Sequence, residues 1–191
     1  TNGAVELADF KVKDVTTGEL VTTLPSLSVQ PLDFDLRQRN LHVGEVKITG
    51  LTRTVRIEKD GSLNLNRLLE PSPAKPAPTN APPATPSAPW TLSVDDFAIN
   101  DAAITFADLG RRTRFETTLK PIQVHLQRFT TRPDSDAAYE FSFPTEAGER
   151  VSGSGTFSIA PLRSAGEVKL AGLEIKKYAP YFEDNLRGKV L

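Results

Sequence analysis

The stretch LADFKVKD (residues 7–14) returns 87 residues later in the chain as VDDFAIND (residues 94–101). A second pair of stretches, PLDFDLR (residues 31–37) and PIQVHLQ (residues 121–127), is separated by 90 residues. Both pairs keep the spacing of their apolar residues, so the chain repeats itself. A period of this length, filled with a few strands and a short helix, predicts an array of similar units.

Apolar and polar residues alternate along most of each unit, as in VKITG (residues 46–50). Alternation with a period of two predicts strands with one apolar face and one polar face. We expect about eleven strands, most of them about five to eight residues long. The alternation changes parity at the same place in both copies, which predicts a β-bulge near Asp9 and another near Asp96.

The first unit is expected to close with EKDGSLNLNRLLEP (residues 58–71). Asp60 and Gly61 predict a tight turn. Asn64 predicts the cap of a short helix that carries Leu65, Leu68 and Leu69. A second short helix is predicted near the end of the chain by the spacing of Ile175, Tyr178, Ala179 and Phe182.

Residues 71–89 are rich in proline and alanine and have no large apolar residue, so they predict a linker or surface loop. The chain therefore divides into a first β unit (residues 1–70), this linker, and a second β unit (residues 90–191). A third echo, EVKITGL (residues 45–51) against EVKLAGL (residues 167–173), indicates that the second unit is cut before completion.

The composition excludes several classes of function. A net charge of −1 with interleaved acids and bases argues against a nucleic-acid partner. The absence of cysteine excludes disulfides, zinc–thiolate sites and thiol nucleophiles. The absence of methionine indicates a piece of a longer protein, so a membrane anchor would lie outside it.

Candidate catalytic residues are few. His42 and His125 lie in strand-like segments without a serine, cysteine or carboxylate at a recognisable spacing, so both are interpreted as ordinary strand residues. Asp95, Asp96 and Asp101 could form an acid pair or a calcium site, but Asp96 and Asp101 restate Asp9 and Asp14 of the first copy at bulge and turn positions, so turn chemistry is the preferred interpretation. The glycines of SGSG (residues 152–155) predict a bulge or bend. We therefore expect no enzyme activity, no metal and no cofactor.

The run ITGLTRTVRIEKDGSLNLNRLL (residues 48–69) resembles the AsmA-like pattern, in which a strand pair ends in a D-G-x-x-N-L turn and a short leucine helix. WTLSVDDFAINDAAITFAD (residues 90–108) and VSGSGTFSIAPLRSAGEVKLAGLEIKKYAPYF (residues 151–182) are similar to the repeat of the large proteobacterial envelope proteins of that superfamily. The resemblance covers residues 46–69 and 90–182 and is weaker before them.

The resemblance implies a mainly β fold, an elongated, twisted antiparallel sheet curled into an open trough, with two short helices. It also implies a periplasmic position within an inner-membrane-anchored protein, with phospholipid tails held in the trough. Strands of five or six residues, roughly 17–20 Å long, would match the ~15 Å of one acyl layer. The expected trough lining is apolar and carries no reactive group: Val46, Ile48, Phe97, Ile99, Ile104, Phe106, Val124 and Phe141.

Two function classes stay open on the sequence. The first is a segment of a lipid conduit between the inner and outer membranes. The second is a non-catalytic envelope module that supports outer-membrane assembly, binding other envelope proteins through exposed strand edges. The apolar residues of this second module would fill a closed sandwich or barrel, which the alternation alone favours.

Overall fold

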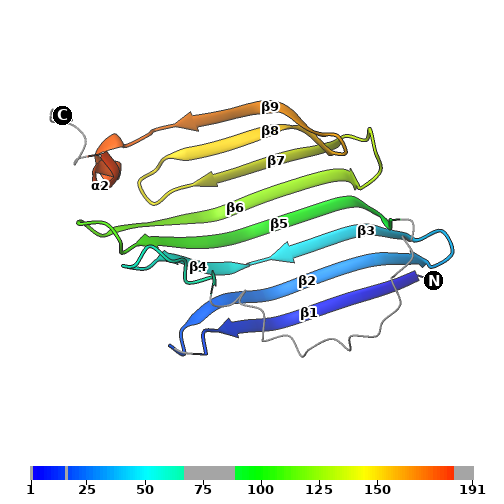
Figure 1. The fold of residues 1–191 in the computed structure, drawn as a ribbon, viewed down its shortest axis with the longest axis horizontal. Coiled ribbons are helices and arrows are strands. Elements are labelled where there is room, and N and C mark those ends of the chain that lie inside the picture. The colour runs from blue at the N-terminus through cyan, green and yellow to red at the C-terminus, as the bar shows by residue number, and fades with distance from the viewer. Residues whose placement is uncertain (1, 16, 67–88, 183–191) are drawn as a thin grey trace, which may run out of the picture.

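The computed structural model describes residues 2–15, 17–66 and 89–182. The described strands form one open sheet of nine strands with β1 and β9 at its two edges (Figure 1). The expectation of a mainly β, open-sheet fold is confirmed. Residues on either side of the predicted linker therefore belong to the same sheet.

The strands follow one another along the chain, and most of them are neighbours in the sheet. Their order across the sheet is β1-β2-β3-β5-β6-β7-β8-β9, and β4 lies between β2 and β5. The bounds are β1 (Asn2–Lys13), β2 (Leu20–Asp35), β3 (Asn40–Thr49), β4 (Thr52–Ile57), β5 (Thr91–Asp108), β6 (Phe115–Thr130), β7 (Ala137–Pro144), β8 (Arg150–Ile159) and β9 (Leu162–Ala171).

The junction between the two units is a parallel pair, which differs from the antiparallel sheet that was expected. Val46 of β3 lies beside Phe97 of β5, and Val55 of β4 lies beside Phe106 of β5, in both cases in parallel register. The other neighbouring strands are antiparallel. β5 therefore begins at the end of the sheet where β3 begins, as a parallel pair requires.

The strands are fewer and longer than the sequence predicted, because parity changes occur inside strands. β5 alone spans 18 residues. Asp9 has a φ of 53°, yet the register continues unchanged on both sides of it. The register is also unchanged around Asp96, where Arg128 (φ 56°) lies in the opposite strand, so the two predicted bulges of one extra residue are wrong. The pairing of β5 with β6 shifts register instead between Ile99 and Ala102, around Asp101, and again between Ala102 and Ile104.

The sequence predicted a turn and a short helix at the end of the first unit and a short helix at the end of the second. The turn at Asp60–Gly61 is confirmed, with the Gly61 N–H donating to the carbonyl of Glu58 at 2.9 Å. Asn64 is buried and its side chain bonds the backbone of β4; the helix that it was predicted to cap lies almost wholly outside the described residues. Leu68, Leu69 and nearly all of the predicted linker lie outside the described residues. The second helix is present as η1 (Ile175–Tyr178) and α2 (Ala179–Phe182).

Candidate functional site

The apolar residues of the sheet line up in two adjacent rows that cross eight strands on one face, which we call the apolar face. Six of the eight predicted lining residues belong to these rows, because the strand register pairs each of them with a row residue on the neighbouring strand. The first row is Leu7, Leu27, Ile48, Ile99, Val124, Phe141, Gly153 and Val168, and the second is Val5, Val29, Val46, Phe97, Leu126, Tyr139, Gly155 and Gly166.

The two other predicted residues, Ile104 and Phe106, lie nearer one end of the strands. Between Ile99 and Ala102, two residues of β5 oppose one residue of β6, so the alternation shifts by one position. Ile104 and Phe106 consequently stay on the apolar face. They are separated from the two rows and lie beside β4.

The apolar face is open among the described residues. All eight predicted lining residues are half-buried, whereas Ala102 of β5, on the same face, is buried. A second sheet packed on this face would bury the central residues of the rows, as in a sandwich. The part of the chain that the structure describes forms a single sheet, so the closed sandwich expected on alternation alone is not formed by these residues.

Aromatic rings of β7 cover glycines of the neighbouring strands on this face. Tyr139 and Phe141 stack along β7 with ring centroids 6.4 Å apart. A Cβ atom added at Gly153 would lie 2.6 Å from the ring of Phe141, and one added at Gly166 would lie 2.6 Å from the Tyr139 hydroxyl. The register of β8 is continuous, so the predicted bulge is absent, and these glycines make room for rings.

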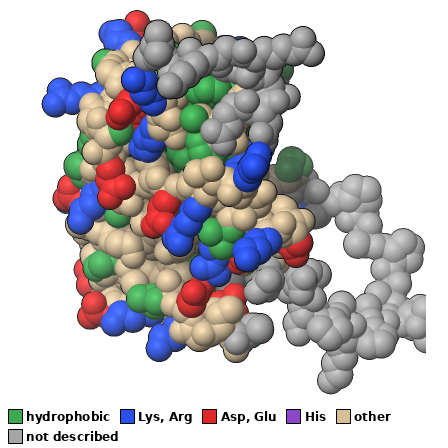
Figure 2. All heavy atoms as spheres, turned by 90° about the vertical axis from the view of Figure 1, so that its left-hand side faces the viewer, with side chains coloured by type: hydrophobic (Ala, Val, Ile, Leu, Met, Phe, Trp, Pro, Cys, Tyr) green, Lys and Arg blue, Asp and Glu red, His purple; other side chains and the backbone are tan. Residues whose placement is uncertain are grey.

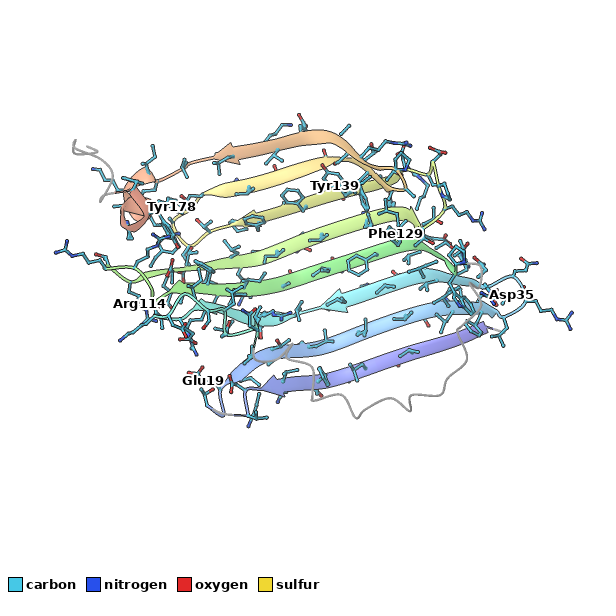
Figure 3. All side chains as sticks on the ribbon, in the orientation of Figure 1. Glu19, Asp35, Arg114, Phe129, Tyr139 and Tyr178 are labelled. Carbon is cyan, nitrogen blue, oxygen red and sulfur yellow. The ribbon has the colours of Figure 1, made fainter. Side chains whose placement is uncertain are left out.

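One end of the apolar face is closed by η1 and α2, which we call the end cap. Phe115, buried at the start of β6, contacts Phe106 on one side and the rings of Tyr178 and Tyr181 on the other. Tyr178 lies at this end of the sheet and Phe129 toward the other (Figure 3). Seen from the capped end, Lys and Arg side chains are interleaved with Asp and Glu side chains (Figure 2).

The end cap is anchored by a buried carboxylate, Glu149, whose side chain is only 1% exposed. It accepts hydrogen bonds from the hydroxyls of Thr145 (2.7 Å) and Tyr178 (2.8 Å) and from the Glu174 N–H (3.1 Å). Burial raises the pKa of Glu149, but these hydrogen bonds and the nearby Lys177 charge lower it further, so the net shift is downward. Burial and the bond to Glu149 raise the pKa of Tyr178 to about 12.

The opposite face of the sheet is polar and contains both histidines. His125 Nε2 lies 2.7 Å from Asp96 and its Nδ1 lies 3.4 Å from Glu140, so one imidazole links β5, β6 and β7. The hydrogen bond to Asp96, together with the charges of Asp96 and Glu140, raises the pKa of His125 against the effect of burial. His42 pairs with Asp95 at 3.0 Å. Asp95 and Asp96 are therefore strand residues that bind histidines, and their interpretation as turn or bulge residues is wrong.

The sequence could not reveal the pairing of His125 with Asp96 or of His42 with Asp95, because the partners come from strands whose register was unknown.

A shallow depression of about 560 Å³ lies on the polar side, where Glu140, Glu167 and Lys169 surround small serines. Within residues 2–15, 17–66 and 89–182, no group of three or more His, Asp or Glu side chains is placed to hold a metal ion. The same residues include no helix long and apolar enough to cross a bilayer.

Comparison of the sequence with protein-family models and with curated proteins finds no match.

Proposed function

We propose that this chain is a segment of an envelope-spanning lipid conduit that binds phospholipid acyl chains on the apolar face. In this proposal it is a periplasmic part of an inner-membrane-anchored protein and carries lipid between the inner and outer membranes. The observation that supports it is the pair of apolar rows, which cross eight strands while their central side chains remain half-exposed. A ligand of the same chemistry as an acyl chain could cover them.

The energetics favour an apolar occupant. Removing apolar surface from water stabilises a complex by roughly 25 cal/mol per Å². The row residues present methyl groups and rings with few polar atoms, so an acyl chain could lie on them without desolvating a charge. Half-exposed side chains that continue from strand to strand would offer a path rather than a single enclosed pocket.

The strands are too long for the expected match with a single acyl layer. The apolar stretch of β5 from Leu92 to Phe106 spans about 46 Å at about 3.3 Å per residue, against ~15 Å for one layer. An acyl chain lying along the strands would cover only part of the face. Its position must then be fixed by something other than the length of the strands.

An envelope interaction module is the second candidate, supported by the two strand edges. β1 and β9 each pair with a single strand in the described part of the chain, and neither contains a proline that would interrupt pairing. Val168 and Leu170 of β9 are 67% and 54% exposed. An added strand from an envelope partner could pair with such an edge.

Adjacent residues of β3 that point to opposite faces test the conduit directly. Ile48→Asp places a carboxylate on the apolar face, and Lys47→Asp is the matched change on the polar face. The delipidated chain is incubated with phospholipid vesicles and reisolated, and bound lipid is measured by native mass spectrometry and thin-layer chromatography. We expect wild type and Lys47→Asp to carry lipid and a folded Ile48→Asp to lose it. A wild-type chain that never acquires lipid would leave the interaction module as the better proposal.

A further inference from the structure

A cation, Arg53 of β4, lies among the apolar residues of the open face without a partner among the described residues. Arg53 is half-buried, and its Nε atom is buried with no hydrogen-bond partner in the part of the chain that the structure describes. No carboxylate of the described residues lies within ion-pair distance of its guanidinium group. Arg56, on the same strand, is by contrast paired with Glu19 and Glu58.

The register places Arg53 on the apolar face. In parallel register Arg53 lies directly beside Ile104 of β5, and in antiparallel register it lies opposite Thr22 of β2. Residues paired in this way point to the same side of a sheet. The Thr22 side chain is therefore on the same side of the sheet as the Arg53 guanidinium group. Arg53 in turn lies beside Ile104, one of the predicted lipid-lining residues.

A buried Nε atom without a partner destabilises the protein when no ligand is bound. A buried polar group that has lost water without gaining a hydrogen bond destabilises the fold, and a charged group does so more strongly. A buried atom of this kind calls for an explanation, and a missing anionic ligand is one. Guanidinium forms a planar fork of donors whose geometry fits phosphate oxygens.

We infer that Arg53, with the Thr22 hydroxyl beside it, binds the phosphate group of a phospholipid on the apolar face. This inference rests on the proposed function and adds the headgroup chemistry and the position of the lipid. Ile104 and Ile99 are separated by about 16 Å along β5, close to the ~15 Å of one acyl layer. A phosphate at Arg53 would therefore place acyl chains over Ile99 and the two rows, away from the end cap.

The test compares two ligands that differ only in the phosphate headgroup. Short-chain phosphatidylglycerol and the diacylglycerol with the same acyl chains are titrated into the delipidated chain by calorimetry. We expect phosphatidylglycerol to bind roughly tenfold or more tightly, the gain typical of charge-assisted hydrogen bonds. Arg53→Gln should lower phosphatidylglycerol affinity to that of diacylglycerol and leave diacylglycerol binding unchanged. Lys47→Gln on the polar face is the control and should bind both ligands as wild type does.

The stability of the lipid-free chain gives an independent readout. Arg53→Leu should raise the melting temperature, because it removes an unpaired buried donor, while it lowers phosphatidylglycerol affinity. A fall in melting temperature would mean that Arg53 supports the fold and would overturn the inference. Equal binding of both ligands by wild type would also overturn it while leaving acyl-chain binding intact.

Two further outcomes separate this inference from the function on which it rests. Binding of neither ligand by wild type would overturn the conduit itself together with the phosphate site. Inorganic phosphate is the third probe. Binding of inorganic phosphate to Arg53 as tightly as phosphatidylglycerol would identify a free-anion site and overturn the lipid assignment.

Discussion

The ring of Phe141 in β7 lies directly over Gly153 in β8, and a Cβ atom at position 153 would come within 2.6 Å of two of its carbons. No side chain larger than hydrogen fits beneath the ring unless the ring moves. This contact joins a predicted lipid-lining residue to a glycine whose role the sequence had not suggested.

Gly153→Val should displace the Phe141 ring and lower stability by about 1–3 kcal/mol, the usual cost of overpacking. Ser154→Val is the matched control, since Ser154 is exposed on the polar face and a strand tolerates valine there. Denaturant unfolding measures both changes. The double variant Phe141→Ala/Gly153→Val should lose less stability than the sum of the losses in the two single variants. Strictly additive losses would show that the packing of the Phe141 ring does not depend on Gly153.

Two substitutions in β5 distinguish the open part of the apolar face from its buried part. Ile99 is half-buried, so the carboxylate of Ile99→Asp can reach water and the chain should stay folded. Ala102 is 3% exposed, so Ala102→Asp should cost several kcal/mol, on the order of 3 or more, and unfold the sheet. Circular dichroism during heating checks both. Equal loss of structure in the two variants would argue that Ile99 is covered as well.

Tyr178→Phe removes the hydroxyl that donates to the buried Glu149 carboxylate at 2.8 Å. A hydrogen bond to a charged group is worth about 1.5–3 kcal/mol, so the end cap should loosen by a similar amount. Hydrogen exchange of residues 175–182 is the measurement, and exchange there should accelerate while that of β1 and β2 stays unchanged. Tyr139→Phe is the control, because the Tyr139 hydroxyl donates no hydrogen bond to the described residues; an equal effect in both variants would contradict the anchor.

His125 should make the stability of the sheet depend on pH. Its folded-state pKa lies above the usual 6.5, because Asp96 and Glu140 favour the protonated form. The stabilisation is therefore fully present below about pH 6.5 and is lost as pH rises through the folded-state pKa. Denaturant midpoints of wild type and His125→Gln, measured between about pH 5 and 8, should converge at the upper end. Asp96→Asn should weaken the same dependence; an unaltered pH profile in both variants would contradict the pairing.

The apolar face could be predicted from the sequence because alternation is a local property of each strand. Val46 and Ile48 are recognisable from their own neighbours, and the register then places them beside Phe97 and Ile99. The direction of that pairing could not be predicted, because a linker of this length allows β5 to run either way. Strand lengths were underestimated for a related reason: a residue with positive φ, such as Arg128, changes parity without ending a strand.

The candidate phosphate site was not predicted either, since Arg53 alternates in the sequence like any surface arginine. Only the register shows that it lies beside Ile104, and only the side-chain contacts show that its buried Nε has no partner among the residues described. The histidines were interpreted as ordinary strand residues for the same reason. Contacts between strands far apart in the sequence decide the role of each of these residues.

The parallel junction of β3 with β5 has a consequence for how such a sheet can grow. β5, the first strand of the second unit, runs in the same direction as β3 and β4. The end of β4 and the end cap therefore lie at the same ends of the strands. The Leu109 N–H, just after β5, donates to the carbonyl of Ile57 at the end of β4, and Tyr181 of the end cap donates to Asp108 at the end of β5. Whole units could therefore be added or removed at an edge of the sheet without exchanging its capped and uncapped ends.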